Sequence, residues 1–110
     1  MWKAVSDRDW STARTLFTDD CVFIDVPADR TIAVKGPDEI VEKLRISLDQ
    51  LTGYAHHPGL LITDGANAIF EHSETWTWTT GHSALLRFVS VHKVCHGRIS
   101  YWKDYWDTGG

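Results

Sequence analysis

The chain has 110 residues, a formal net charge of −4 at pH 7 and 43% hydrophobic residues. This composition is typical of a single globular domain over residues 1–110. The 11 Lys and Arg residues form no cluster, which excludes a typical nucleic-acid-binding surface. No apolar run approaches the roughly 20 residues needed to span a bilayer, and the N-terminus has no export signal pattern, so we expect a cytoplasmic protein that contacts no membrane.

The N-terminal quarter predicts two short helical segments followed by a strand. Trp2 and Val5 form one apolar turn, and apolar residues recur at helical spacing from Trp10 to Phe17. The run Cys21–Pro27 is rich in β-forming residues and ends at a proline. We expect residues 28–35 to form a loop.

The clearest helix begins at Gly36-Pro37. A proline near the first helical position and two acidic residues in the first turn favour this start, and Gly53 predicts the end. Glu39 and Lys43 are spaced for an outward-facing ion pair. The predicted apolar face consists of Ile40, Val41, Leu44, Leu48 and Leu51.

The second half of the chain predicts an antiparallel meander. Its hairpin signals are Asp64-Gly65, Thr80-Gly81 and His96-Gly97. Long strands in a small sheet curve, and the helical segments must cover the concave face. The sequence therefore predicts an α+β fold, a cone whose mouth can hold a small molecule. The expected strands are Tyr54–Thr63, Ala66–Thr79, His82–Cys95 and Arg98–Asp107.

The strand from Ala66 to Thr79 places bulky and charged residues on one face. With a period of two, Phe70, His72, Glu74 and Trp76 share a side. Because aromatic rings are costly to expose, we expect this side to face inward, carrying Glu74 with it. The alternative is that the carboxylates are exposed and pair with basic residues on neighbouring strands.

Two other strands repeat this pattern. Asp104 lies between Trp102 and Trp106 on one face, and Phe23 shares a face with Asp25. Three strands can therefore each bring a carboxylate to the same apolar face. Two close buried carboxyl groups cannot both ionise easily, so they can supply an acid and a base at one pH. We expect His72 to bridge them.

The remaining histidines and cysteines give weaker signals. His56 and His57 lack a third ligand at a zinc-like spacing, and we expect a surface pair and no metal site. The alternation around His92 does not decide which way it faces. Two cysteines are too few for a disulfide framework, so we expect Cys21 and Cys95 to be buried free thiols in a reducing compartment.

The order of helical segments and meander resembles the NTF2-like cone fold, and three segments resemble its limonene-epoxide-hydrolase branch. In that family an Asp–Arg–Asp triad opens an epoxide in one step, without metal or cofactor. The first Asp activates water, the second protonates the epoxide oxygen, and the Arg links them. The segments are Phe23-Ile24-Asp25-Val26-Pro27, Glu71-His72-Ser73-Glu74 and Trp102-Lys103-Asp104-Tyr105-Trp106-Asp107.

By this resemblance Asp104 takes the water-activating position, Glu74 the position of the acid, and His72 that of the linking Arg. Asp25 and Phe23 take the places of a water-holding Asn and Tyr. A His with carboxylates in such a cone also resembles the SnoaL-like polyketide cyclases and ketosteroid isomerases, which move protons on carbon. The family often closes its pocket with terminal segments, so we expect here an open mouth or one covered by a partner subunit.

Three functional hypotheses remain. The first is an acid–base enzyme that uses no cofactor, with epoxide hydration as the leading reaction. The second is a protein that binds an apolar or cationic molecule between aromatic walls and acidic groups. The third is a scaffold whose sheet face forms a homodimer, which we expect in any case because Leu85, Val89 and Val91 lie on the outer face. The expected catalytic residues are Asp104, Glu74, His72 and Asp25, and the expected substrate contacts are Phe23, Phe70, Trp76, Trp102 and Trp106.

Overall fold

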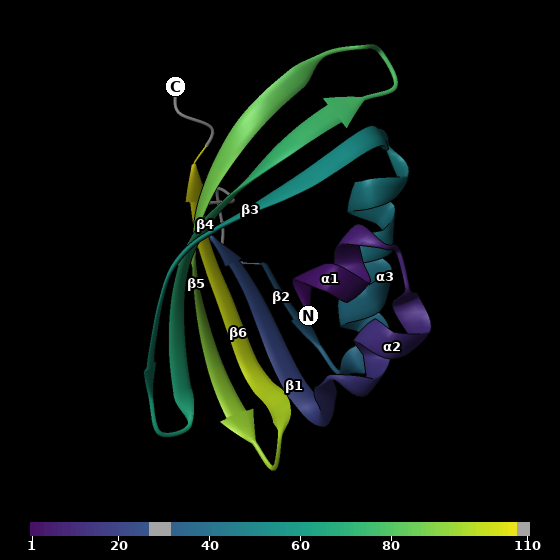
Figure 1. The fold of residues 1–110 in the computed structure, drawn as a ribbon. Coiled ribbons are helices and arrows are strands. Elements are labelled where there is room, and N and C mark those ends of the chain that lie inside the picture. The colour runs from purple at the N-terminus through teal and green to yellow at the C-terminus, as the bar shows by residue number, and fades with distance from the viewer. Residues whose placement is uncertain (27–31, 108–110) are drawn as a thin grey trace.

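A computed structural model describes residues 1–26 and 32–107, and within them the helices precede the long strands (Figure 1). The two classes of element match the predicted α+β fold. The helices are α1 (Trp2–Ser6), α2 (Trp10–Thr15) and α3 (Pro37–Asp49). The strands are β1 (Phe17–Val26), β2 (Ile32–Lys35), β3 (Leu51–Asp64), β4 (Asn67–Trp78), β5 (Ser83–Cys95) and β6 (Arg98–Asp107).

The strands form one curved sheet in the order β2-β1-β6-β5-β4-β3. Neighbouring strands are antiparallel except β1 and β6, which run parallel. Figure 1 shows the helices on the concave side, with α1 lying between the sheet and α3. This is the cone of curved sheet and covering helices that the order of elements predicted.

The helix α3 begins where the sequence predicted and ends earlier. Gly36 precedes it with a φ of 84°, a conformation that glycine adopts without strain. Its buried residues are Ile40, Val41 and Leu48. The predicted extension to Gly53 was wrong, because Leu51 already pairs with Trp78 in the sheet. Leu51 is nevertheless buried, as its apolar side chain requires.

The first strand starts four residues before the prediction. Phe17, which the helical spacing placed in the preceding helix, opens β1 opposite Ile99 and is buried. The pairing of β1 with β6 then shifts register before Val22, so the strand accommodates the bulge that the alternation did not reveal. Residues 32–35 were expected in a loop and instead form β2 against β1. Pro27 and residues 28–31 lie outside the described residues.

The core lies between α3 and the sheet. Its main cluster contains Phe17, Cys21, Phe23, Ile40 and Trp102. Both cysteines are free, as expected. The expectation that Cys95 is buried was wrong: it ends β5 at the turn before His96 and is exposed.

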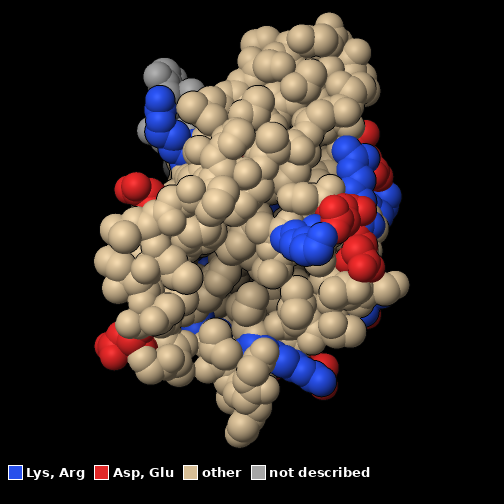
Figure 2. All heavy atoms as spheres, in the orientation of Figure 1, with Lys and Arg blue, Asp and Glu red and all other residues tan. Residues whose placement is uncertain are grey.

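On the face seen in Figure 2, most of the visible charged side chains lie on the side of the helices, and much of the remaining surface is uncharged. On the helices, Arg45 pairs with Glu42 and Asp49, and Arg14 pairs with Asp38. None of the helices in the described ranges is long and apolar enough to cross a membrane. Leu85 and Val89 on β5 are exposed, and the homodimer that they suggested stays a prediction.

Candidate active site

The central strands turn a set of polar side chains toward the concave face. His72 and Glu74 of β4 are 4% and 6% exposed, and Asp104 of β6 is 6% exposed. The period-two interpretation of β4 and β6 was therefore correct about which side faces inward. The alternative of exposed carboxylates paired with basic side chains is excluded for Glu74 and Asp104.

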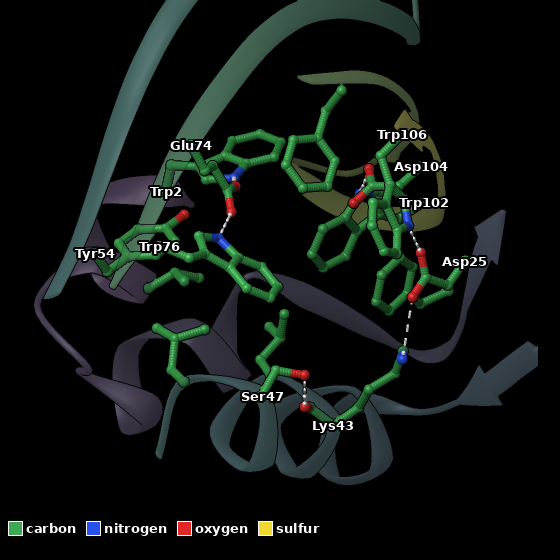
Figure 3. Close-up of a pocket in the computed structure, with 15 residues that line it drawn as sticks. Trp2, Asp25, Lys43, Ser47, Tyr54, Glu74, Trp76, Trp102, Asp104 and Trp106 are labelled. Atoms are coloured by element: carbon green, nitrogen blue, oxygen red, sulfur yellow. Dashed lines mark hydrogen bonds and ion pairs between the residues drawn. The ribbon is translucent and has the colours of Figure 1, made fainter. Parts of the chain in front are cut away.

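A cavity of about 70 Å³ opens between these strands and the helices (Figure 3). Two carboxyl groups from the central strands, Glu74 and Asp104, reach its wall, and Asp25 of β1 joins them. In Figure 3 Glu74 lies on one side of the cavity, and Asp25 and Asp104 lie on the other. The other residues of the wall are Trp2, Val5, Phe23, Lys43, Leu44, Ser47, Leu48, Tyr54, Trp76, Phe88, Trp102 and Trp106.

Glu74 is surrounded by donors. The indole Nε1 of Trp2 donates to Oε2 at 3.2 Å, and that of Trp76 donates to Oε1 at 2.8 Å. The hydroxyl of Tyr54 also favours the ionised form of this carboxyl group. Burial raises the pKa of Glu74 above its ordinary value, although the donors from Trp76, Tyr54 and Trp2 oppose this effect. Burial and the charge of Glu74 in turn raise the pKa of Tyr54, so the phenol keeps its proton.

Asp104 is held through one of its two oxygens. The hydroxyl of Ser90 and the indole Nε1 of Trp102 both donate to Oδ1, each at 2.5 Å. Burial raises the pKa of Asp104 to about 7, against the lowering effect of these two donors. The carboxylates of Glu74 and Asp25 raise this pKa further. Asp104 therefore changes its protonation state near neutral pH, as a group that exchanges protons with a substrate must.

Asp25 has a different environment from Asp104. Trp106 donates from Nε1 to Asp25 Oδ1 at 2.5 Å, and Lys43 of α3 lies 3.2 Å from Oδ2. Lys43 was expected to pair outward with Glu39. It instead points into the cavity, where its ammonium group also lies 5.7 Å from the centre of the Phe23 ring.

His72 does not bridge the two carboxylates as expected. Its Nε2 lies 2.7 Å from Ser90 Oγ, so the link to Asp104 passes through the serine hydroxyl. Its Nδ1 faces His56 Nε2 at 3.0 Å and not Glu74. Burial lowers the pKa of His72 to about 3, and the ring is neutral at pH 7.

Three residues close to the site, His72, Ser90 and Phe70, do not line the cavity. The rings of Trp2 and Phe88 line the cavity and also pack on His72, with centroids 4.5 and 5.2 Å from it, so they separate the imidazole from the cavity. Phe70 stacks on the imidazole, with its centroid 4.8 Å away. The expected substrate contact at Phe70 is thus placed behind the wall. Phe23, Trp76, Trp102 and Trp106 lie in it.

A family model for the SnoaL-like domain matches residues 1–102 of the chain. The chain belongs to the SnoaL-like domain family. No curated protein sequence matches it.

Solved structures of similar fold carry different functional descriptions. An LEH-like epoxide hydrolase of M. tuberculosis has a TM-score of 0.80 and 23% identity, over 96% of this chain and 75% of that one. A Shewanella putrefaciens protein that is described by its fold and family as a SnoaL-like polyketide cyclase has a TM-score of 0.81 and 17% identity, over 96% of this chain and 82% of that one. A Catenulispora acidiphila protein with a ketosteroid isomerase-like fold was solved in complex with trimethylamine. It has a TM-score of 0.80 and 13% identity, over 93% of this chain and 78% of that one. At these identities the likeness shows the shared fold.

One group in this SnoaL-like domain has the composition of a metal site. His56, His72 and Glu74 offer ligand atoms that lie within 4.8 Å of one another. In the described structure the two imidazole nitrogens already face each other at hydrogen-bond distance, and both oxygens of Glu74 accept indole N–H groups. A divalent ion would have to replace these bonds.

Four contributors to the site were missed from the sequence: Trp2, Tyr54, Ser90 and His56. Ser90 lies on the same face of β5 as Phe88 and His92. The alternation along β5 would have placed Ser90 in the site if the sequence had shown that this face points inward. Tyr54 and His56 share one face of β3, and the period of two places His57 on the other face. His57 is exposed and contacts Thr75 on the other face of the sheet. No sequence signal placed Trp2, because α1 is a five-residue helix positioned by tertiary packing.

Proposed function

We propose that this protein is an acid–base enzyme that acts on a small, largely apolar molecule and requires no cofactor. The observation that carries the proposal is the carboxyl group of Asp104. It is buried at the wall of an aromatic cavity, has a pKa of about 7, and has a second buried carboxyl group, Glu74, on the opposite side. A molecule between the two can receive a proton on one side and lose one on the other.

The leading reaction is the addition of water to an epoxide. Water attacks a ring carbon and loses a proton to the base, the C–O bond breaks, and the acid protonates the released oxygen to give a diol. The resemblance gives the base role to Asp104. Burial raises the pKa of both acids, but donors from three residues oppose it at Glu74 and from only two at Asp104, where the neighbouring carboxylates raise the pKa further. We therefore place the proton of the resting pair on Asp104 as the acid, with Glu74 activating water.

The similar fold of an epoxide hydrolase supports this reaction class, and the SnoaL-like cyclase supports a related one. In this related reaction, Asp104 and Glu74 would move a proton from one atom of an enolisable ketone to another. Both reactions need Asp104 to exchange one proton with the substrate. They differ in their products: only the first incorporates oxygen from water.

A panel of aliphatic and aromatic epoxides in ¹⁸O-labelled water, together with enolisable ketones in deuterated water, tests the proposal. We expect wild-type protein to convert at least one epoxide to a labelled diol. The Asp104→Asn variant should lose about 10²–10⁴-fold in kcat, the usual contribution of a positioned acid or base. The exposed Asp64 provides the matched control, and Asp64→Asn should retain full activity. Turnover by folded D104N equal to that of wild type would exclude the role of Asp104.

A second candidate is binding without turnover. Its support is a cavity with aromatic walls and three carboxylates against one ammonium group, which suits a small organic cation. A protein of similar fold holds trimethylamine. Calorimetry with trimethylammonium and tetramethylammonium salts tests this candidate. Binding lost in Glu74→Gln, together with no turnover across the panel, would favour it.

A further inference from the structure

A continuous chain of hydrogen bonds leads from the edge of the sheet to the candidate acid. His56 Nε2 and His72 Nδ1 are 3.0 Å apart, His72 Nε2 and Ser90 Oγ are 2.7 Å apart, and Ser90 Oγ and Asp104 Oδ1 are 2.5 Å apart. The four side chains come from β3, β4, β5 and β6, neighbours in the sheet. His56 is partly exposed, whereas the other three are buried.

The donors and acceptors of this chain can all point the same way. If Asp104 is ionised, Ser90 must donate to it, so the hydroxyl oxygen accepts from His72 Nε2–H. The neutral imidazole of His72 then has a bare Nδ1, which accepts from His56 Nε2–H. If Asp104 is protonated, each of these bonds reverses. In both states each of the three hydrogen bonds has one donor and one acceptor.

We propose that His56, His72 and Ser90 form a proton relay that supplies the Asp104 carboxyl group from solvent while substrate fills the cavity. The inference rests on the proposed function, in which Asp104 gives up a proton in each turnover. The relay approaches from behind the cavity wall, because Trp2 and Phe88 separate His72 from the cavity. His56, His72 and Ser90 act through Asp104 and are positioning residues.

The transfer is balanced. One proton binds at His56 Nδ1, and the proton on His56 Nε2 passes to His72 Nδ1. The proton on His72 Nε2 passes to Ser90 Oγ, whose own proton passes to Asp104 Oδ1. One proton enters and one carboxylate is neutralised, and both histidines end as neutral rings of the other tautomer.

The order of the residues excludes a role for Ser90 as a nucleophile. A nucleophilic serine donates to its histidine and lies at the site of the substrate. The Ser90 hydroxyl lies between the imidazole and the carboxylate, is 0% exposed, and is not part of the cavity wall. The same geometry favours a relay over a metal site, because both nitrogens of His72 are already engaged in the chain.

Several other titratable groups face the relay. Glu74 from β4 and Asp25 from β1 act on Asp104. His92 from β5 acts on His72. His57 and the N-terminal amine act on His56, whose pKa is lowered mainly by burial. None of these groups completes a hydrogen bond of the chain among the described residues.

The kinetic test uses His56→Gln. A glutamine side chain can still donate to His72, but an amide does not pass a proton on. We expect kcat to fall about tenfold or more, with KM unchanged. This loss should be smaller than the loss on direct removal of the acid or base. Ser90→Ala, which interrupts the chain one step from Asp104, should have the same effect. The matched control is the exposed neighbour, and His57→Gln should equal wild type.

The spectroscopic test does not depend on turnover. In ¹⁵N NMR, we expect His72 to carry its proton on Nε2 when Asp104 is ionised and on Nδ1 when Asp104 is protonated. Asp104→Asn should make the tautomer independent of pH. A His72 tautomer that stays constant through the Asp104 titration overturns the relay, as does wild-type kcat in both H56Q and S90A. An inactive wild-type protein with the tautomer switch intact overturns the proposed function and leaves the relay in place.

Discussion

Asp25 and Asp104 are direct register partners on the parallel strands β1 and β6, yet their carboxylates lie in different environments. Asp25 accepts an indole N–H and pairs with the ammonium group of Lys43. Asp104 accepts an indole N–H and the hydroxyl of Ser90, and no cation pairs with it in the described part of the chain. Two neighbouring acids on one face of the sheet are thus divided into a paired carboxylate and a proton-exchanging one.

The charges around Asp104 should control its pKa in a defined order. Glu74→Gln and Asp25→Asn each remove a negative charge that raises this pKa, so both should lower it. The effect of E74Q should be larger, because Lys43 already offsets part of the charge of Asp25. Carbon-13 NMR of the Asp104 carboxyl group measures both shifts. Glu71→Gln on the exposed side of β4 is the control, and a shift as large as that of E74Q would contradict the explanation.

Ionisation of Asp104 should destabilise the fold as pH rises. The folded pKa is about 7 and the ordinary value is 3.8, so the folded state holds its proton more tightly than the unfolded chain. The stabilisation is complete below pH 3.8 and is lost as pH rises through 7, with a contribution of up to about 1.4 kcal/mol per pH unit to the slope. Urea denaturation of wild type and D104N at several pH values checks this. The difference in free energy of unfolding between wild type and D104N should change between pH 3.8 and 7 and stay constant below pH 3.8.

His92 should destabilise the fold through its unpartnered nitrogen. Its Nε2 is buried without a hydrogen-bond partner among the described residues, and the ring packs on Trp2 and Trp102. His92→Phe keeps an aromatic ring there and removes a polar atom that costs about 1–3 kcal/mol when buried alone. We expect a higher free energy of unfolding in urea. A decrease would show that His92 Nε2 makes a stabilising contact.

The benefit of His92→Phe should also grow in acid. Burial lowers the pKa of His92 from 6.5 to about 4, so the folded state binds its proton less tightly than the unfolded chain. The stability associated with the neutral ring is present above pH 6.5 and is lost as pH falls through 4. Denaturation at pH 7, 5 and 4 should therefore show a widening gap between H92F and wild type. A constant gap would mean that His92 has the same pKa in the folded and unfolded states.

The β3–β4 pairing should depend on Gly59. A Cβ atom there would lie 2.4 Å from the carbonyl oxygen of Glu71, at the register shift between Pro58 and Leu61. Gly59→Ala must displace the backbone, and we expect a loss of about 1–3 kcal/mol in thermal or urea denaturation, as for other overpacked sites. The neighbouring Leu60 is 63% exposed, and Leu60→Ala should change stability little. Equal effects of the two variants would rule out this steric explanation.

The local pattern of the sequence was enough to place the acids. Alternation along β4 and β6 put Glu74 and Asp104 on the face of the rings because each strand has its own period of two. The helix at Pro37 and the long antiparallel strands followed in the same way from local signals. These features depend on residues a few positions apart, and one sequence carries that information.

Tertiary structure decided the contacts between the acids and their partners. The parallel pairing of β1 with β6, which sets Asp25 beside Asp104, joins segments about 80 residues apart, and no local period encodes such a register. The orientation of α3 turned Lys43 toward Asp25, and the pairing of β3 with β4 brought His56 rather than His57 to His72. A strand's period fixes which face a side chain occupies, but the side chains opposite it depend on register and packing across the whole sheet.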